Sequence, residues 1–228
     1  MKKKTRLGLW MLIPGTSIII LVLVAILACA GRTDYWQGWL FFFLTIAGYV
    51  GNYLAIRDKP DLVSERLKPG KGVKWWDMLY FALSTPLFLI MIGVSALDAG
   101  RFGWTTVPTW LVLFGSLVYL AGYAVFLWAK HVNSYFSSFV RIQKDRGQTV
   151  CTEGPYKIVR HPGYVGAILY TVASPLVLGS FWGLVPALLT LFVLIGRTYM
   201  EDNMLKNELP GYAKYAQRVR YRLAPGIW

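Results

Sequence analysis

The chain has 228 residues, a formal net charge of +13 and a mean hydropathy of +0.46. Hydrophobic residues make up 56% of it and charged residues only 15%, which excludes an ordinary soluble globular protein, where about 25% of residues are charged. The positive charge alone would suit a nucleic-acid-binding protein, but its distribution along the chain favours a membrane protein.

The first part of the chain contains four uncharged runs, each long enough to cross a bilayer. They cover residues 7–31, 35–56, 78–97 and 102–129. A membrane-spanning helix needs about 20 mostly apolar residues. The first run is too long for a signal peptide and lacks an Ala-x-Ala cleavage site, so we interpret it as a helix. We therefore predict that residues 1–130 form a region of four transmembrane helices.

The basic residues are concentrated on one side of this predicted topology. If the N-terminus is cytoplasmic, the two external loops hold only Arg32 and Arg101, and the other 22 of the 24 Lys and Arg residues lie at the cytoplasmic side or its boundary. This asymmetry is typical of the positive-inside rule and accounts for the charge without a nucleic acid partner. We predict an integral, multi-pass membrane protein with both termini in the cytoplasm.

The character of the chain changes after Lys130, and residues 131–228 form a second predicted region. Residues 131–160 are too polar to span a membrane, so we expect them along the cytoplasmic interface, partly helical to about Lys144 and then looped at Arg146–Gly147. Residues 161–196 contain no Lys, Arg, Asp or Glu and have a natural turn at 179–183. They predict a helical hairpin over about 163–179 and 183–202. The predicted fold is an all-α polytopic protein of about six transmembrane helices.

Polar segments next to this hairpin are the candidate functional residues. Arg197 and Glu201 are four residues apart and share a helical face. Charged groups at membrane depth are costly and tend to face a wet or bundled interior. Because the hairpin returns to its starting side, we expect His161, Tyr164, Arg197 and Glu201 to be neighbours. Structural roles remain open for each: an Arg197–Glu201 ion pair, interfacial anchoring, or a helix start at Pro162.

The cysteine and histidine content gives no sign of a metal site. The two cysteines, Cys29 and Cys151, are predicted to lie on opposite sides of the membrane, and the chain has two histidines. Neither a Cys-x-x-Cys nor a His-Glu-x-x-His spacing occurs. We predict no bound metal.

Three motifs in residues 140–228 resemble the isoprenylcysteine carboxyl methyltransferase family. They are Gly-Pro-Tyr-x-x-x-Arg-His-Pro-x-Tyr-x-Gly at 154–166, Arg-x-x-x-Glu-Asp at 197–202 and Leu-Pro-Gly-Tyr-x-x-Tyr at 209–215. Membrane methyltransferases that act on phospholipid amines look similar over the same stretch, as do sterol reductases that use a nicotinamide cofactor. The resemblance implies a cytoplasm-facing pocket for S-adenosylmethionine that is built without a Rossmann domain.

The resemblance also implies roles for individual residues. It places catalytic roles on Arg197 and His161. One position departs from the family pattern, since Asp202 stands where the family often has Glu. The residues implied in cofactor binding are Gln143, Gln148, Thr149, Val150, Cys151, Tyr156, His161, Pro162, Gly163, Tyr164 and Glu201.

The chemistry of methyl transfer fits these residue types. Glu201 suits a cationic group of S-adenosylmethionine, and Arg160 or the helix N-terminus at Pro162 suits its carboxylate. A carboxylate acceptor needs no base, and Arg197 can orient it through two hydrogen bonds. An amine acceptor must be neutral to react, so it would need a base such as His161 or Glu201.

We therefore expect an integral membrane methyltransferase that uses S-adenosylmethionine and a lipophilic acceptor that enters from the bilayer. A carboxylate such as isoprenylcysteine is favoured because of Arg197. The alternatives are a phospholipid-amine N-methyltransferase, an NADPH-dependent sterol or isoprenoid reductase, and a membrane protein without catalytic activity. The sequence leaves the oligomeric state and the host membrane open.

Overall fold

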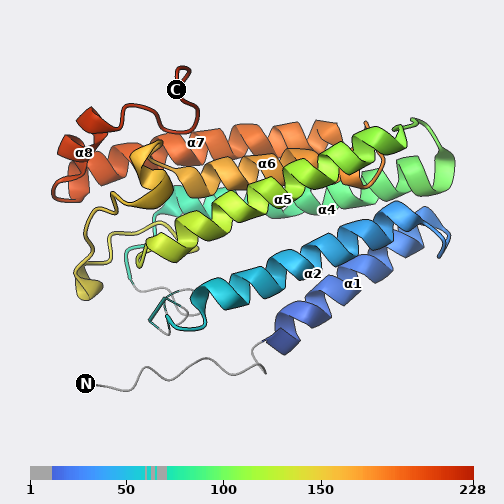
Figure 1. The fold of residues 1–228 in the computed structure, drawn as a ribbon, viewed down its shortest axis with the longest axis horizontal. Helices are drawn as coiled ribbons and strands as arrows, with labels where there is room; N and C mark the ends of the chain where they lie inside the picture. The colour runs from blue at the N-terminus through green and yellow to red at the C-terminus, as the bar shows by residue number, and fades with distance from the viewer. Residues whose placement is uncertain (1–11, 60, 63–64, 66–70) are drawn as a thin grey trace.

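The structure is a computed structural model that describes residues 12–59, 61–62, 65 and 71–228, and within that part the regular secondary structure is helical, without strands. The long helices run side by side along one axis (Figure 1). This confirms the predicted all-α fold. The α-helices are α1 (Leu12–Ala30), α2 (Trp36–Ile56), α4 (Trp75–Ser95), α5 (Thr109–Val132), α6 (Pro162–Val177), α7 (Leu184–Glu208) and the short α8 (Tyr212–Arg218). A π-helix, η2 (Ala96–Phe102), continues α4, and two short 3₁₀ helices are η3 (Lys144–Arg146) and η4 (Gly154–Lys157).

The lengths and surfaces of these helices suit a bilayer. Among the described residues, α1, α2, α4 with η2, α5 and α7 are long and apolar enough to cross a membrane, and α6 is a shorter apolar helix of 16 residues. Large apolar side chains point outward, including Leu21, Leu117 and Phe192, each about two-thirds exposed. The protein is therefore an integral membrane protein. The prediction of a cytoplasmic N-terminus falls on residues 1–11, which lie outside the described part.

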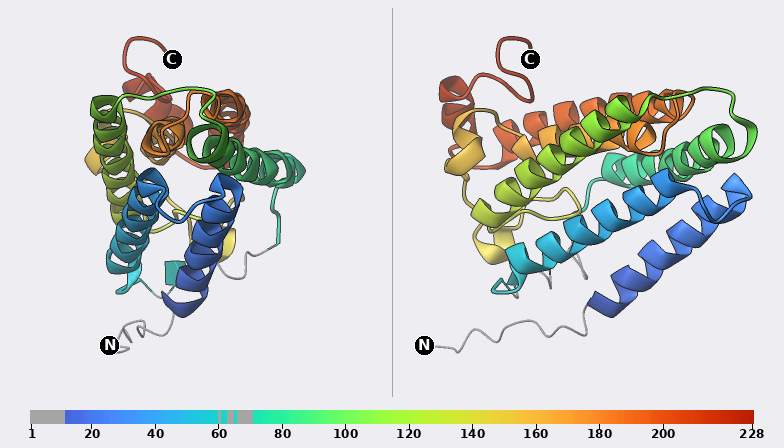
Figure 2. Two further views of the ribbon diagram at one scale, coloured as in Figure 1. Left: turned by 90° about the vertical axis from the view of Figure 1, so that its right-hand side faces the viewer. Right: turned by 45° about the vertical axis from the view of Figure 1, so that its right-hand side comes forward.

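Helices α6 and α7 form the predicted C-terminal hairpin, and α6 is the central element of the bundle. Viewed nearly end-on, α6 lies between α5 and α7 (Figure 2). A Cβ added at Gly166 would lie 2.5 Å from the Gly122 carbonyl oxygen, and one added at Gly122 would lie 2.7 Å from the Tyr170 nitrogen. The backbones of α5 and α6 therefore approach closely because glycine stands at both crossing positions.

The structure around Asp98, at the end of the bundle that carries the turn between α6 and α7, differs from the loop predicted there. The sequence placed Asp98 in an external loop, but it lies in η2 and is fully buried. Its carboxylate accepts hydrogen bonds from Thr105 N at 2.7 Å, Thr105 Oγ1 at 2.5 Å and Ser180 Oγ at 2.6 Å. With these partners the helix continues to Phe102, into the predicted loop, and α5 begins at Thr109.

The segment between α5 and α6 is also different from prediction. Residues 133–143 are not helical, so the expected interfacial helix to Lys144 is wrong. Side chains from other parts of the chain provide the hydrogen bonds that a helix would otherwise supply. The Asp77 carboxylate accepts a bond from Val140 N at 2.8 Å, and Arg197 Nη2 donates to the Ser138 carbonyl at 2.8 Å. The predicted loop at Gly147 is present, with a φ of 61°.

Candidate functional site

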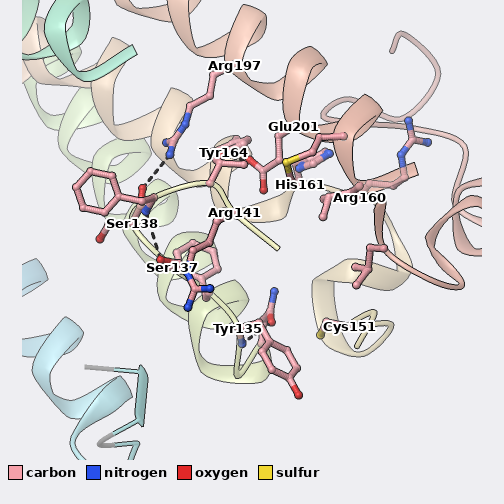
Figure 3. A pocket seen from close by; sticks show the side chains of 18 of the residues that line it. Tyr135, Ser137, Ser138, Arg141, Cys151, Arg160, His161, Tyr164, Arg197 and Glu201 are labelled. Atoms are coloured by element: carbon pink, nitrogen blue, oxygen red, sulfur yellow. Dashed lines mark hydrogen bonds between the residues drawn. The ribbon is translucent and has the colours of Figure 1, made fainter. Parts of the chain in front are cut away.

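A cavity of about 250 Å³ lies at the end of the bundle that carries residues 133–161 and the C-terminal segment. Its volume is near the lower end of ligand pockets in proteins, which span about 300–1,000 Å³. Its lining contains both apolar side chains of the transmembrane helices and polar side chains, several of which are labelled in Figure 3. The apolar part includes Phe81 of α4, Phe126 of α5, Ala167 and Tyr170 of α6, and Leu194 of α7.

The structure places nearly all predicted site residues around this cavity. Pro162 is the exception, because it is buried at the first position of α6 and does not line the cavity. The residues that do line it are Gln143, Gln148, Thr149, Val150, Cys151, Tyr156, His161, Gly163, Tyr164, Arg197 and Glu201. The 133–151 segment, η4, α6 and α7 therefore contribute to one site, as the predicted hairpin requires.

The four residues expected to be neighbours do lie together. The rings of His161 and Tyr164 are stacked, with centroids 5.7 Å apart and planes within 7°. The Tyr164 hydroxyl donates a hydrogen bond to Glu201 Oε2, and the guanidinium carbon of Arg197 lies 5.3 Å from the centre of the Tyr164 ring. Figure 3 shows these side chains converging on the cavity.

Arg197 has a different ionic partner from the one its spacing suggested. Its partner is Asp77 at the start of α4, through Nε at 2.8 Å and Nη2 at 2.7 Å, and Asp77 is completely buried. The guanidinium also packs 4.2 Å from the centre of the Tyr80 ring. Arg197 lines the cavity, and its Nη1 takes no part in the bonds to Asp77 and Ser138.

The Asp77–Arg197 pair leaves Glu201 as a carboxylate that faces the cavity. Asp77 pairs with Arg197, while the Glu201 carboxylate accepts a hydrogen bond from Tyr164 and lines the cavity. Opposite charges attract strongly in surroundings of low polarity. This wall therefore favours a ligand with a cationic group near Glu201.

Arg160 does not act as a free cation in the cavity. Nε and Nη2 donate to the two Asp202 oxygens at 2.7 Å and 2.9 Å, and Nη1 donates to the carbonyls of Val219 and Arg220 at 2.8 Å and 2.6 Å. Four of the donors of this guanidinium are therefore taken by the protein's own groups. Of the two anion partners considered from the sequence, the N-terminus of α6 remains the better placed.

Asp202 holds the C-terminal segment against the site. Besides Arg160, it accepts bonds from Lys206 Nζ at 2.8 Å and Arg222 Nε at 2.9 Å. The backbone of the segment also pairs with the Arg-His motif, since Arg160 N donates to the Tyr221 carbonyl at 2.9 Å and His161 N donates to the Arg222 carbonyl at 3.0 Å. The shorter Asp side chain thus serves the interior of the protein, while Glu201 faces the cavity.

The side-chain amides of Gln143 and Gln148 are engaged in the folding of the loop. Gln143 Nε2 donates to the Tyr135 carbonyl at 2.9 Å, its Oε1 accepts a bond from Arg146, and its backbone N donates to Gln148 Oε1 at 2.7 Å. Nearby Arg141 binds Glu65 through Nε and Nη2, both at 2.7 Å. The hydrogen bonds that Arg141 donates to Glu65 raise the pKa of the Arg141 guanidinium, which therefore stays charged.

Two further wall residues remain neutral near pH 7. Burial raises the pKa of the Cys151 thiol and also that of the Tyr156 phenol. Cys151 is therefore not an activated thiolate nucleophile. Both cysteines are free, and among the described residues there is no group of three His, Cys, Asp or Glu side chains able to hold a metal ion.

Several residues of the site were not predicted from the sequence. Asp77 served only as the boundary of an uncharged run, although a lone carboxylate at membrane depth is itself a signal of a buried partner. Asp202 was left open. Tyr212 and Tyr215 belong to the Leu-Pro-Gly-Tyr-x-x-Tyr motif but were given no role in the site. The others had no sequence signal that we can identify, and they are Tyr80, Phe81, Ser138 and Arg141.

Comparison with known proteins found one family similarity, over the central part of the chain. Residues 110–210 match the model of the phospholipid methyltransferase family. This stretch contains nearly all of α5, all of α6 and α7, and the loop residues that line the cavity. A search of curated proteins found no match to the chain.

Proposed function

We propose that this chain is a membrane methyltransferase that transfers a methyl group from S-adenosylmethionine to a lipid amine, in keeping with the match of residues 110–210 to the phospholipid methyltransferase family. The observation that carries the proposal is the divided wall of the cavity. One part is polar with a free carboxylate, and the other is apolar and formed by α4–α7. Such a cavity suits a charged methyl donor and a lipophilic acceptor that meet at the membrane surface.

The residues present fit S-adenosylmethionine, which supplies a methyl group activated on a sulfonium. Glu201 carries the negative charge that suits the sulfonium or the ammonium group. Tyr156 and Tyr164 provide aromatic faces in the same cavity. The Gly163 N–H lies in the first turn of α6, where backbone N–H groups lack partners within the helix, and it suits the carboxylate of the donor.

The apolar part of the wall supports a lipophilic acceptor. Phe81, Phe126 and Leu194 belong to helices that cross the membrane, so the acceptor's hydrocarbon portion would remain in apolar surroundings while its head group meets the methyl donor. Methyl transfer is an in-line displacement, so most of the rate enhancement comes from positioning two opposed reactants. The acceptor enters from the bilayer and the methyl donor from the cytoplasm.

A lipid carboxylate is the second candidate acceptor, and Arg197 Nη1 is the observation that favours it. Arg197 lines the cavity, and this group is not engaged with Asp77 or Ser138. The carboxylate ranks second because Asp77 already neutralises Arg197 and Glu201 would repel a second anion. Arg197→Gln separates the two, since it should abolish transfer to a carboxylate and leave transfer to an amine largely intact.

Cofactor binding by the purified protein in detergent tests the proposed activity. S-adenosylhomocysteine should raise the unfolding temperature of the wild type, and NADPH should not. Glu201→Gln should weaken binding of S-adenosylhomocysteine by about tenfold, the effect of losing about 1.4 kcal/mol from a charged contact. Glu208→Gln is the matched control, because Glu208 lies on the same helix and pairs with Lys74 away from the cavity. Stabilisation by NADPH alone would support the reductase, and a response to neither compound would overturn catalytic function.

A further inference from the structure

The geometry around the Arg-His motif assigns a base and a residue that positions it. We infer that His161 accepts a proton from the ammonium head group of the acceptor through Nδ1, and that Asp202 positions the ring for this task. The inference rests on the proposed function and extends it, because it selects a lipid amine over a lipid carboxylate. An amine must lose a proton before it attacks a methyl group, whereas a carboxylate does not.

The contacts of His161 fix which ring nitrogen carries the proton. Nε2 lies 3.2 Å from Asp202 Oδ1 and 3.3 Å from the Tyr212 hydroxyl. The Tyr212 hydroxyl donates to the same Asp202 oxygen at 3.1 Å. An ionised carboxylate only accepts hydrogen bonds, so Nε2 is the ring nitrogen that carries hydrogen. Nδ1 is then the nitrogen with a free lone pair.

Nδ1 faces the cavity rather than the protein interior. His161 is the N-cap residue of α6, but its side chain makes no capping hydrogen bond. Within the part of the chain that the structure describes, Ser95 Oγ is the buried side-chain polar atom that lacks a hydrogen-bond partner. Because His161 Nδ1 is not such an atom and has no partner, it must be accessible. His161 itself is 7% exposed and lines the cavity. Its lone pair is therefore open to a ligand in the cavity.

Asp202 is held in place independently of His161. Arg160, Lys206 and Arg222 all donate to its carboxylate at 2.7–2.9 Å, and these cations favour its charged form. The stacked Tyr164 ring supports the other side of the imidazole. The charged and titratable groups around the ring are Tyr156, Arg160, Tyr164, Glu201, Asp202, Tyr212 and Arg222.

Glu201 is less suited to the role of base. One of its oxygens already accepts a hydrogen bond from the Tyr164 hydroxyl. Its charge is also the one that the proposed function assigns to the cationic groups of the methyl donor. A carboxylate that pairs with a sulfonium or ammonium is a weaker proton acceptor than a free imidazole nitrogen.

The step balances in atoms and electrons. The ammonium gives one proton to His161 Nδ1, and the nitrogen lone pair that is freed attacks the methyl carbon. The N–C bond forms while the C–S bond breaks, and its electron pair stays on sulfur, which becomes the neutral thioether of S-adenosylhomocysteine. The imidazolium then returns its proton to water. Without a base, an alkylammonium that titrates near 10.4, like a lysine side chain, is neutral in roughly one molecule in 2,500 at pH 7.

The test measures methyl transfer from labelled S-adenosylmethionine to two kinds of phosphatidylcholine vesicle. One kind contains phosphatidylethanolamine, and the other contains farnesylcysteine as the carboxylate probe. Wild type should methylate the amine lipid and not the carboxylate. His161→Ala should lower kcat by about 10²–10⁴-fold, the usual contribution of a general base. Its remaining rate should increase with added imidazole, or increase with pH as solvent deprotonates the amine.

Asp202→Asn tests the positioning role, because an amide can donate to Nε2 and so move the ring proton to Nδ1. It should lower kcat at least tenfold while the KM for S-adenosylmethionine changes by less than about threefold. Glu208→Gln should leave both unchanged. If Asp202→Asn does not fold, as judged by stabilisation with S-adenosylhomocysteine, the His161→Ala measurements decide alone.

The outcomes separate failure of this inference from failure of the proposed function. Transfer to farnesylcysteine but not to phosphatidylethanolamine overturns the inference and leaves a methyltransferase. The inference also fails if His161→Ala keeps the wild-type kcat, or if its low rate responds to neither imidazole nor pH. Absence of both S-adenosylhomocysteine binding and methyl transfer overturns the proposed function together with the inference.

Discussion

The buried pair between Asp77 and Arg197 allows a quantitative test of how the cavity wall is built. Asp77→Asn retains the shape of the side chain but leaves the charge of Arg197 without its partner. Asp77 is 0% exposed and Arg197 is 9% exposed, so water cannot readily replace the lost carboxylate. Removing one partner of a buried ion pair costs about 3–5 kcal/mol.

The expected loss lies at the lower end of this range. The amide oxygen of Asn can still accept one of the bonds that Val140 N and Arg197 now donate. We therefore expect a loss of about 3 kcal/mol. For a chain of this size, 1 kcal/mol shifts Tm by about 2–4 °C, so Tm should fall by roughly 6–12 °C.

Thermal unfolding of purified variants in one detergent measures this effect. The set is Asp77→Asn, Arg197→Gln and the double variant, because a double-mutant cycle isolates the interaction between two residues. If the pair is formed as described, the double variant should be more stable than Asp77→Asn alone. The surface pair of Lys74 and Glu208 is the control, and Glu208→Gln should cost at most about 1 kcal/mol.

Additivity would refute the reasoning. If the two single losses sum to the loss of the double variant, Asp77 and Arg197 do not stabilise each other. A Tm for Asp77→Asn that equals that of wild type would have the same meaning. Either result would return Arg197 to the cavity as an unpaired cation and would strengthen the case for a carboxylate acceptor.

Two further predictions test the helix packing and the position of the methyl donor. Gly122→Ala should destabilise the protein by about 1–3 kcal/mol, because its Cβ would lie 2.7 Å from a backbone nitrogen of α6. Gly196→Ala should be neutral or slightly stabilising, because nothing lies within 4 Å of the added atom. Thermal unfolding measures the stability of both variants. In a Cys29→Ser background, S-adenosylhomocysteine should slow maleimide labelling of Cys151, which lines the cavity, and labelling at an unchanged rate with bound ligand would contradict the assigned donor site.

The hairpin could be predicted from the sequence because it depends on composition and on one turn. Residues 161–196 lack charges, and Gly179 takes a positive φ of 75° at the predicted turn. Once the hairpin returns, the proximity of Tyr164 and Glu201 follows from helix length alone. The site residues were found because they lie at the two ends of this hairpin.

The ionic partners could not be predicted, because they come from distant parts of the chain. Spacing suggested that Arg197 pairs with Glu201, but the bundle brings Asp77, 120 residues away in sequence, closer. The same contacts explain the wrong helix prediction for residues 131–144. The amphiphilic composition there suits an interfacial helix, but Asp77 and Arg197 bind the backbone of Val140 and Ser138, which is not helical.

The pairing of the arginines around the cavity has a consequence for ligand selection. Arg141, Arg160 and Arg197 all line it, and each is bound to carboxylates from the same chain. These carboxylates are Glu65 and Asp145 for Arg141, Asp202 for Arg160, and Asp77 for Arg197. Asp202 is shared among Arg160, Lys206 and Arg222, so positive charge remains on the side of His161, while Glu201 contributes negative charge on the side of Tyr164. A ligand that carries both a cationic and an anionic group therefore matches this cavity better than a ligand with a single charge.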